Sequence, residues 1–235
     1  MTLLRQLPLC LLLVGALGLS GCAAYQPVTL YQLEAGELAV PAGDQGLAVL
    51  LGPVSVADYL QRETLLQRQP DGSLTAADNA RWAGNLAAEI DQQLLRQLAS
   101  RLDSQRLLLA PATPGFIPQV RVALSITRLD SGPQRPAVLE AQWRLAAADG
   151  KLLDGRLVRL EEAHQGTLVD QVRAQSLVLQ QLVEQLALAV ETYASPPPLA
   201  APQPKPAPAK PVAKPPAPRI PVAQPQRNEA EVFRF

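Results

Sequence analysis

Apolar and polar residues alternate along this chain with periods that differ between segments, and each period predicts a type of secondary structure. Segment 47–56 (LAVLLGPVSV) is an apolar, β-branched run interrupted by a glycine–proline pair, which predicts a buried strand with a bend. Segment 63–76 consists of two short runs around Pro70-Asp71-Gly72, where proline fixes φ and glycine supplies a positive φ. We therefore expect a β-hairpin there.

A helical period follows the hairpin. Every fourth residue from Leu86 to Leu102 is leucine or isoleucine, which gives one apolar stripe, and charged residues lie away from it. This pattern predicts a helix from about Ala80 to Leu102, with Asp78 or Asn79 as the residue that caps its N-terminus.

A second helix is predicted from Gly166-Thr167 to about Thr192. Thr167 and Asp170 have the spacing of a capping box, although aspartate replaces the usual glutamate. The apolar stripe of this helix consists of Leu168, Val172, Leu179, Leu182, Val183, Leu186 and Val190.

Between the two helices, a short strand at 106–110 and a proline-rich loop at 111–118 precede three strands. Apolar and polar residues alternate strictly in 119–129 and 138–146, and Asp149-Gly150, a preferred tight-turn pair, leads to a third strand at about 152–161. Such alternation leaves one sheet face packed and the other solvated, as is usual in antiparallel sheets. The sequence thus predicts an α/β fold: a mainly antiparallel sheet with two long amphipathic helices on one face.

The N-terminus has the layout of a secretory signal peptide. Arg5 precedes an apolar run from Leu7 to Leu19, which is shorter than the ~20 residues that span a bilayer and lacks a basic stop-transfer flank. The following LSGC resembles the bacterial lipobox. This resemblance implies cleavage between Gly21 and Cys22, a diacylglycerol on the Cys22 thiol and an acyl chain on the new amino terminus.

Several acyl chains, at ~0.8 kcal/mol per buried methylene, make a stable anchor. An ordinary signal peptide with a chance cysteine is the alternative. Cys10 lies inside the leader, so the mature chain is expected to have no disulfide and no cysteine-based metal site. Ala23 and Ala24, rather than an acidic residue, follow Cys22. By resemblance to lipoprotein sorting signals, this favours the periplasmic face of the outer membrane.

Composition divides the chain into a leader (1–21), a body (22–194) and a tail (195–235). Thirteen of the 23 prolines lie in the tail, which carries six Lys or Arg against two Glu, whereas residues 23–194 carry 14 against 19 acidic residues. An acidic body argues against nucleic acid as a partner. The tail is expected to be disordered and extended as polyproline II, spanning on the order of 90 Å over thirty residues.

Such a tail could contact peptidoglycan, anionic headgroups or a transporter component, or it could serve only as a solubilising segment. Its last five residues, EVFRF, alternate apolar and charged side chains. We expect Val232, Phe233 and Phe235 to let this segment add as a strand to an exposed sheet edge.

The sequence offers little catalytic chemistry. It contains no G-x-S-x-G, no phosphate-binding glycine loop and no H-E-x-x-H, and its single histidine, His164, stands near Glu161 and Glu162. One histidine with adjacent carboxylates is more often a solvated turn than a metal site. The protein is therefore expected to have no catalytic residues, no metal and no cofactor other than the covalent lipid on Cys22.

Three segments carry a family resemblance: YQL at 31–33, LAVLLGPVSVADYLQR at 47–62 and DNARWAGNLAAEIDQQLLRQLASRL at 78–102. Together with the later strands and the closing helix, they resemble the PqiC (YmbA) family of ABC-type transport auxiliary lipoproteins over about residues 25–194. This resemblance implies a homo-oligomeric lipoprotein of the outer membrane. It would work with an MCE-domain protein and membrane components of a lipid-transport system that supports envelope integrity.

Asp58, Tyr59 and Leu60 follow the bend in the first strand, where loops often carry function. Tyr59 and Trp82 belong to only nine aromatic residues, and aromatic side chains are frequent interface anchors. We therefore regard Asp58, Tyr59, Leu60 and Trp82 as candidates for contact with a partner; the alternative is that both aromatic rings only hold the first helix on the sheet. The competing function is a structural envelope lipoprotein whose basic tail tethers the outer membrane to peptidoglycan.

Overall fold

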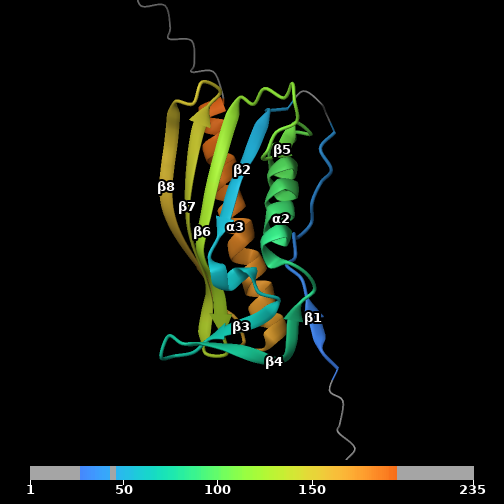
Figure 1. Ribbon diagram of the computed structural model, residues 1–235, viewed down its shortest axis with the longest axis vertical. Coiled ribbons are helices and arrows are strands. Elements are labelled where there is room, and N and C mark those ends of the chain that lie inside the picture. The colour runs from blue at the N-terminus through green and yellow to red at the C-terminus, as the bar shows by residue number, and fades with distance from the viewer. Residues whose placement is uncertain (1–26, 43–45, 195–235) are drawn as a thin grey trace, which may run out of the picture. The chain divides into compact units, whose positions relative to one another are not determined.

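The structure is a computed structural model that describes residues 27–42 and 46–194 (Figure 1). The leader, the lipobox with Gly21 and Cys22, the proline-rich tail and its terminal Val232, Phe233 and Phe235 lie outside the described residues. The expectations about those segments therefore stay predictions.

The described chain forms strands, two α-helices and one 3-10 helix. In order they are β1 (Thr29–Tyr31), β2 (Val49–Val56), η2 (Asp58–Gln61), β3 (Thr64–Arg68), β4 (Leu74–Trp82), α2 (Leu86–Arg101), β5 (Leu107–Leu109), β6 (Val120–Gly132), β7 (Arg135–Ala147), β8 (Leu152–Glu162) and α3 (Leu168–Ala194).

The strands join into one mixed sheet. The long strands β6, β7 and β8 form consecutive antiparallel hairpins, and β3 and β4 form another, as the sequence predicted. However, β2 runs parallel to both β5 and β6, β1 runs parallel to β4, and β3 meets the far end of β6 in parallel. The sheet is thus antiparallel along its longest ladders and parallel where segments distant in sequence meet.

Both α-helices lie on the same face of the sheet, which confirms the predicted layering (Figure 1). α3 packs along β6, β7 and β8, α2 packs beside β2 and β5, and the two helices contact each other. Leu86, Ile90, Leu94 and Leu98 of the predicted α2 stripe are at most 1% exposed. Burying each of these side chains contributes about 1.5–3 kcal/mol, so the stripes account for much of the driving force for this layer.

The predicted start of the first helix was wrong. β4 continues through Trp82 because its last residues pair with β1, and Ala80 and Trp82 pack in the core. Asn79, one of the two predicted caps, is instead a residue of β4 with a φ of +53°. The cap is Asn85, whose Oδ1 accepts the Ala88 amide at 3.0 Å.

The other local predictions agree with the structure. Gly52 has a φ of +118°, and the β2–β6 register shifts between Leu51 and Val54, so β2 bends where the glycine–proline pair stands. At the start of α3, the Thr167 hydroxyl accepts the Asp170 amide at 3.2 Å and donates to the Asp170 carboxylate at 2.7 Å. Within the described ranges, neither helix is both long and apolar enough to cross a membrane.

Candidate functional site

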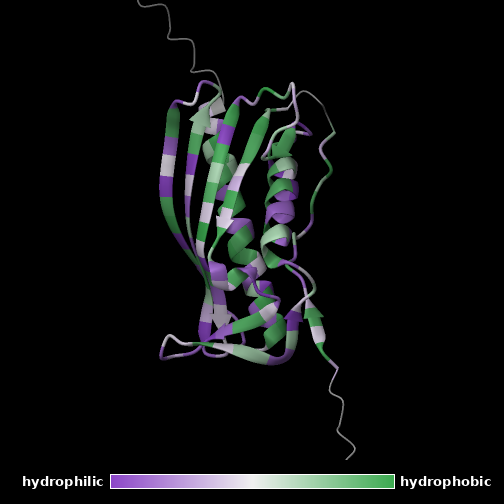
Figure 2. Cartoon of the chain, viewed as in Figure 1, coloured by the Kyte–Doolittle hydropathy of each residue, from purple (hydrophilic) through white to green (hydrophobic). Residues whose placement is uncertain are grey.

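The candidate site lies on the sheet face opposite the helices. Polar and apolar residues alternate along β6 and β7 (Figure 2), and their buried apolar side chains, such as Leu124 and Trp143, belong to the same core as those of α3. The opposite face is the one that the sequence predicted to be solvated, and both α-helices lie behind it in Figure 1. Strand register decides which side chains on this face become neighbours.

The half of this face near the β6–β7 turn carries charges that neutralise one another. Arg159 on β8 makes an ion pair with Glu140 on β7 and contacts Glu161 at 2.5 Å. Arg128 on β6 lies 3.7 Å from the same Glu140. The side chains of these pairs are partly exposed to solvent, so each pair contributes little stability, roughly 0–1 kcal/mol. They leave this half of the face with no unpaired acidic side chain among the three strands.

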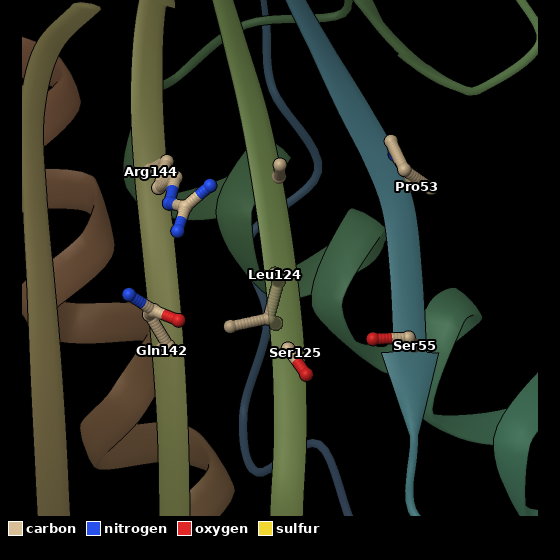
Figure 3. Close-up of a pocket in the computed structure, with 7 residues that line it drawn as sticks. Pro53, Ser55, Leu124, Ser125, Gln142 and Arg144 are labelled. Carbon is tan, nitrogen blue, oxygen red and sulfur yellow. The ribbon is translucent and has the colours of Figure 1, made fainter.

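The other half contains a shallow hollow of about 220 Å³. Ser55 from β2, Ser125 from β6, and Gln142 and Arg144 from β7 supply its polar side chains (Figure 3). The two serine hydroxyls point into the gap between β2 and β6, and the Arg144 guanidinium lies between β7 and β6. None of these four side chains makes a hydrogen bond or ion pair with another described residue.

Small neighbours keep this hollow open. Arg144 lies opposite Ala123 on one side and Gly155 on the other, so neither adjacent strand places a long side chain beside it. A Cβ atom on Gly155 would lie 3.5 Å from the Arg144 Cγ. Arg121, which is exposed, lies opposite Ala146 and is therefore a diagonal neighbour of Arg144, within reach of a long side chain.

A buried polar network lies where β3 meets the far end of β6. The Asp130 carboxylate, 1% exposed, accepts hydrogen bonds from Arg68 at 2.5 Å, Arg128 at 2.9 Å and the Tyr59 hydroxyl at 3.1 Å. Burial alone would raise the pKa of Asp130, but the hydrogen bonds from the two arginines outweigh it and hold that pKa below its ordinary value.

Burial, and next the charge of Asp130, raise the pKa of Tyr59 to about 12. Tyr59 therefore stays protonated near neutral pH and keeps donating to the carboxylate. The network joins η2, β3 and β6, and its paired, ionised groups are suited to holding the fold rather than to proton transfer.

The partner candidates occupy different environments. Leu60 and Trp82 are 3% and 6% exposed and belong to the core, Tyr59 is half-buried in the Asp130 network, and Asp58 is exposed. Tyr59, Trp82 and Leu86, the first residue of α2, line one small cavity, which fits the alternative interpretation, in which the two aromatic rings hold the first helix on the sheet. A contact with a partner stays a prediction, and Asp58 is the candidate best placed to make it.

His164 ties the segment before α3 to the start of β7. Its Nε2 lies 2.8 Å from the Arg135 carbonyl oxygen, and its Nδ1 accepts the Gly166 amide at 3.0 Å. These contacts place the proton on Nε2. In residues 27–42 and 46–194, no three His, Cys, Asp or Glu side chains gather in an arrangement that could hold a metal ion.

The predicted alternation in 119–129 and 138–146 implies that Arg121, Ser125, Gln142 and Arg144 lie on the solvated face, but it does not single them out. Alternation predicts which face a side chain occupies, whereas the presence of an ion-pair partner depends on the register between strands. It also missed Asp130, because an aspartate between leucine and serine gives no sign that it is buried.

Comparison with known proteins gives the fold and the family. Residues 31–187 match the family model of the ABC-type transport auxiliary lipoprotein component, whereas the search of curated proteins gives no match. The crystal structure of an uncharacterized protein is 23% identical, with a TM-score of 0.52, and the match covers 72% of this chain and 100% of that chain. A Xanthomonas campestris protein of the family DUF330 is 15% identical, with a TM-score of 0.54 and coverage of 70% and 97%.

The PelC dodecamer from Paraburkholderia phytofirmans is 14% identical over 67% of this chain and 96% of that chain, but its TM-score of 0.38 is too low to bear on this chain's assembly. The first two likenesses support the fold alone. The family model, however, extends from β1 into α3 and so spans most of the folded body. The chain therefore belongs to the family of ABC-type transport auxiliary lipoprotein components, the PqiC (YmbA) type that its sequence resembles.

Proposed function

We propose that this chain is a non-enzymatic accessory lipoprotein of an MCE/ABC-type intermembrane lipid-transport system, anchored through Cys22 to the periplasmic face of the outer membrane. The observation that carries the proposal is the family match over residues 31–187 directly behind a leader that ends in LSGC. An MCE-domain protein and the membrane components of the transporter are its proposed partners.

The packing of the body supports an accessory role. The space between the sheet and the helices is filled by side chains such as Leu51, Leu139, Trp143 and Leu182, each at most 1% exposed. The hollow on the open face is shallow, open and smaller than the pockets of ~300–1,000 Å³ that enclose ligands, and its lining mixes polar and apolar side chains. We therefore propose that the domain acts through its surface, on partner proteins and on headgroups, rather than by enclosing an acyl chain.

The anchor limits where the body acts. Thr29, the first residue of β1, is only seven residues beyond Cys22. Seven extended residues span at most roughly 25 Å, so the β1 edge is held near the membrane surface. The remaining surface of the body and the tail are then available to a partner that approaches from the periplasm.

Crosslinking in intact membranes tests this proposal. Partners of the wild-type chain are captured and identified by mass spectrometry, next to the Cys22→Ala variant. Cys10→Ala is the matched control, because it makes the same change inside the leader. Recovery of an MCE-domain protein with the wild type and Cys10→Ala, and its loss with Cys22→Ala, is the expected result. Recovery of wild type in the inner-membrane fraction would contradict the proposed location.

The tether function is favoured by a different feature, the basic, proline-rich tail. A variant that ends at residue 194 separates the two functions. If the tail is a tether, co-sedimentation with peptidoglycan disappears in this variant while MCE capture is never seen. If the protein is a transport accessory, the truncated variant still captures the MCE-domain protein.

We also propose that the terminal EVFRF adds as a strand to a sheet edge. Exposed sheet edges accept added strands. Deletion of residues 229–235 is expected to weaken partner capture; unchanged capture and an unchanged envelope phenotype would overturn this assignment.

A further inference from the structure

We propose that the hollow on the open sheet face binds the phosphate of an anionic phospholipid headgroup, with Arg144 and Arg121 as its cationic ligands. The proposal deepens the transport function proposed above and rests on it for the source of the ligand. It is carried by the charge balance of the face, by the geometry of the hollow and by the apolar residues beside it.

The charge balance comes first. Every acidic side chain on β6, β7 and β8 already has a polar partner: Asp130, Glu140, Asp154 and Glu161 pair with arginines, and Glu162 accepts from Gln181. Arg121 and Arg144 make no ion pair with a described residue. These two neighbouring cations therefore leave an uncompensated positive charge on this half of the face.

Geometry then selects a small anion. The hollow of about 220 Å³ is shallow and open to solvent, so it suits a small polar group such as phosphate better than an enclosed acyl chain. Ser55, Ser125 and Gln142 supply hydroxyl and amide donors in its lining and make no hydrogen bond with a described residue. Guanidinium groups match phosphate oxygens with two parallel hydrogen bonds, and the neighbouring donors can complete the shell.

Apolar side chains next to the hollow favour a lipid over free phosphate. Leu157, 80% exposed, lies opposite Gln142, and Leu152, 63% exposed, lies opposite Ala146, both on β8. They border the same half of the open face as Arg144. A lipid whose phosphate is bound between the arginines would place its glycerol and first methylenes on these leucines. Free phosphate would make no use of apolar side chains at these exposed positions.

The test uses the full lipidated chain in a non-ionic detergent, and isothermal titration calorimetry measures binding. The probes are dihexanoyl phosphatidylglycerol, dihexanoyl phosphatidylcholine and inorganic phosphate. We expect phosphatidylglycerol to bind most tightly, with an affinity that falls as salt rises. Arg144→Gln should weaken binding about ten- to a hundredfold, the effect of one hydrogen bond to a charged group, and Arg144→Lys should restore part of it.

Two further variants sharpen the result. Arg96→Gln makes the same chemical change at an exposed position on α2, behind the sheet, and should leave binding unchanged. Leu157→Ser should weaken binding of phosphatidylglycerol but not of inorganic phosphate. Thermal unfolding confirms that each variant folds.

Absence of phosphatidylglycerol binding to the wild type, or equal binding by Arg144→Gln and the wild type, would overturn the proposal. If inorganic phosphate binds as tightly as phosphatidylglycerol, the hollow is a site for free phosphate and the lipid is not its ligand. Membrane crosslinking of the same variants separates this outcome from failure of the proposed function. If the MCE-domain protein is recovered but no lipid binds, only the proposed headgroup site is wrong. If lipid binds but that partner is not recovered, the proposed transport function is wrong.

Discussion

Tyr59 donates its hydroxyl proton to Asp130 Oδ2 at 3.1 Å, and the same hydroxyl accepts the Leu129 amide at 3.0 Å. One phenol therefore satisfies a buried carboxylate and a backbone N–H of β6 at once. Because Arg68 on β3 binds the same carboxylate oxygen, the contact fixes the short helix η2 at the junction of two strands.

Removing this hydroxyl should cost stability without changing the fold. In Tyr59→Phe, the Leu129 amide loses its acceptor and Asp130 loses one donor, so we expect the free energy of unfolding to fall by about 1–2 kcal/mol. Urea unfolding followed by the fluorescence of the buried Trp82 and Trp143 measures it. Tyr31→Phe is the matched control, because the partly buried Tyr31 hydroxyl makes no hydrogen bond with a described residue. Equal losses in the two variants would contradict the role of the Tyr59 hydroxyl.

Asp130 should make the fold sensitive to acid. Its pKa is depressed in the folded state and is about 3.9 in the unfolded chain, so its contribution is complete above about pH 4–5. The contribution is lost as the pH falls through the folded pKa, because the folded carboxyl then also binds a proton. Urea unfolding between pH 2 and 7 should show this decline.

Asp130→Asn should lower stability by roughly 3 kcal/mol at neutral pH, since two arginines lose their counter-charge, and should reduce the decline in acid. Asp58→Asn is the control, because Asp58 is exposed and lies outside the network. An acid profile of Asp130→Asn parallel to that of the wild type would mean that other carboxyls cause the decline.

Local sequence patterns predicted most elements because hairpin turns and helical stripes are encoded by nearby residues. Pro70-Asp71-Gly72, Asp149-Gly150 and the α3 cap all lie where the structure has them. Patterns could not predict that β2 pairs in parallel with β5 and β6, because those partners are more than fifty residues away. For the same reason, the sequence could not predict that Arg144 has no ion-pair partner, because this depends on which residues the neighbouring strands place opposite it.

The misplaced start of α2 has a physical cause and a direct test. Asp78 and Asn79 are both good capping residues, and Trp82 continues the four-residue spacing of Leu86 and Ile90, so sequence alone favoured the earlier start. In the structure, pairing with β1 keeps these residues in β4, and the cap is Asn85.

We expect Asn85→Ala to lower the free energy of unfolding by about 1 kcal/mol, because the Ala88 amide loses its acceptor. Asp78→Ala should change it by less than about 0.5 kcal/mol, since Asp78 is an exposed residue within β4. Thermal and urea unfolding of the two variants measures the difference. If Asp78→Ala lowered the free energy of unfolding more than Asn85→Ala does, the helix would begin at the earlier position that the sequence predicted.

β6 approaches β3 closely at Gly132, because this residue has no side chain. A Cβ atom at Gly132 would lie 1.9 Å from the Arg68 carbonyl oxygen, a backbone atom that cannot rotate away. Gly132→Ala should therefore force the two strands apart and lower the free energy of unfolding by about 3 kcal/mol, the upper end for overpacked sites. Gly84→Ala is the matched control, because nothing lies within 4 Å of its Cβ position.

The displacement should also reach the Asp130 network, because the residue that must move is Arg68 itself. Gly132→Ala is therefore expected to weaken the Arg68–Asp130 ion pair, now 2.5 Å long, and to flatten the acid dependence as Asp130→Asn does. Loss of stability with an unchanged acid profile would mean that the strands separate without disturbing the carboxylate. Wild-type stability in Gly132→Ala would mean that β3 does not cross the end of β6 at this distance.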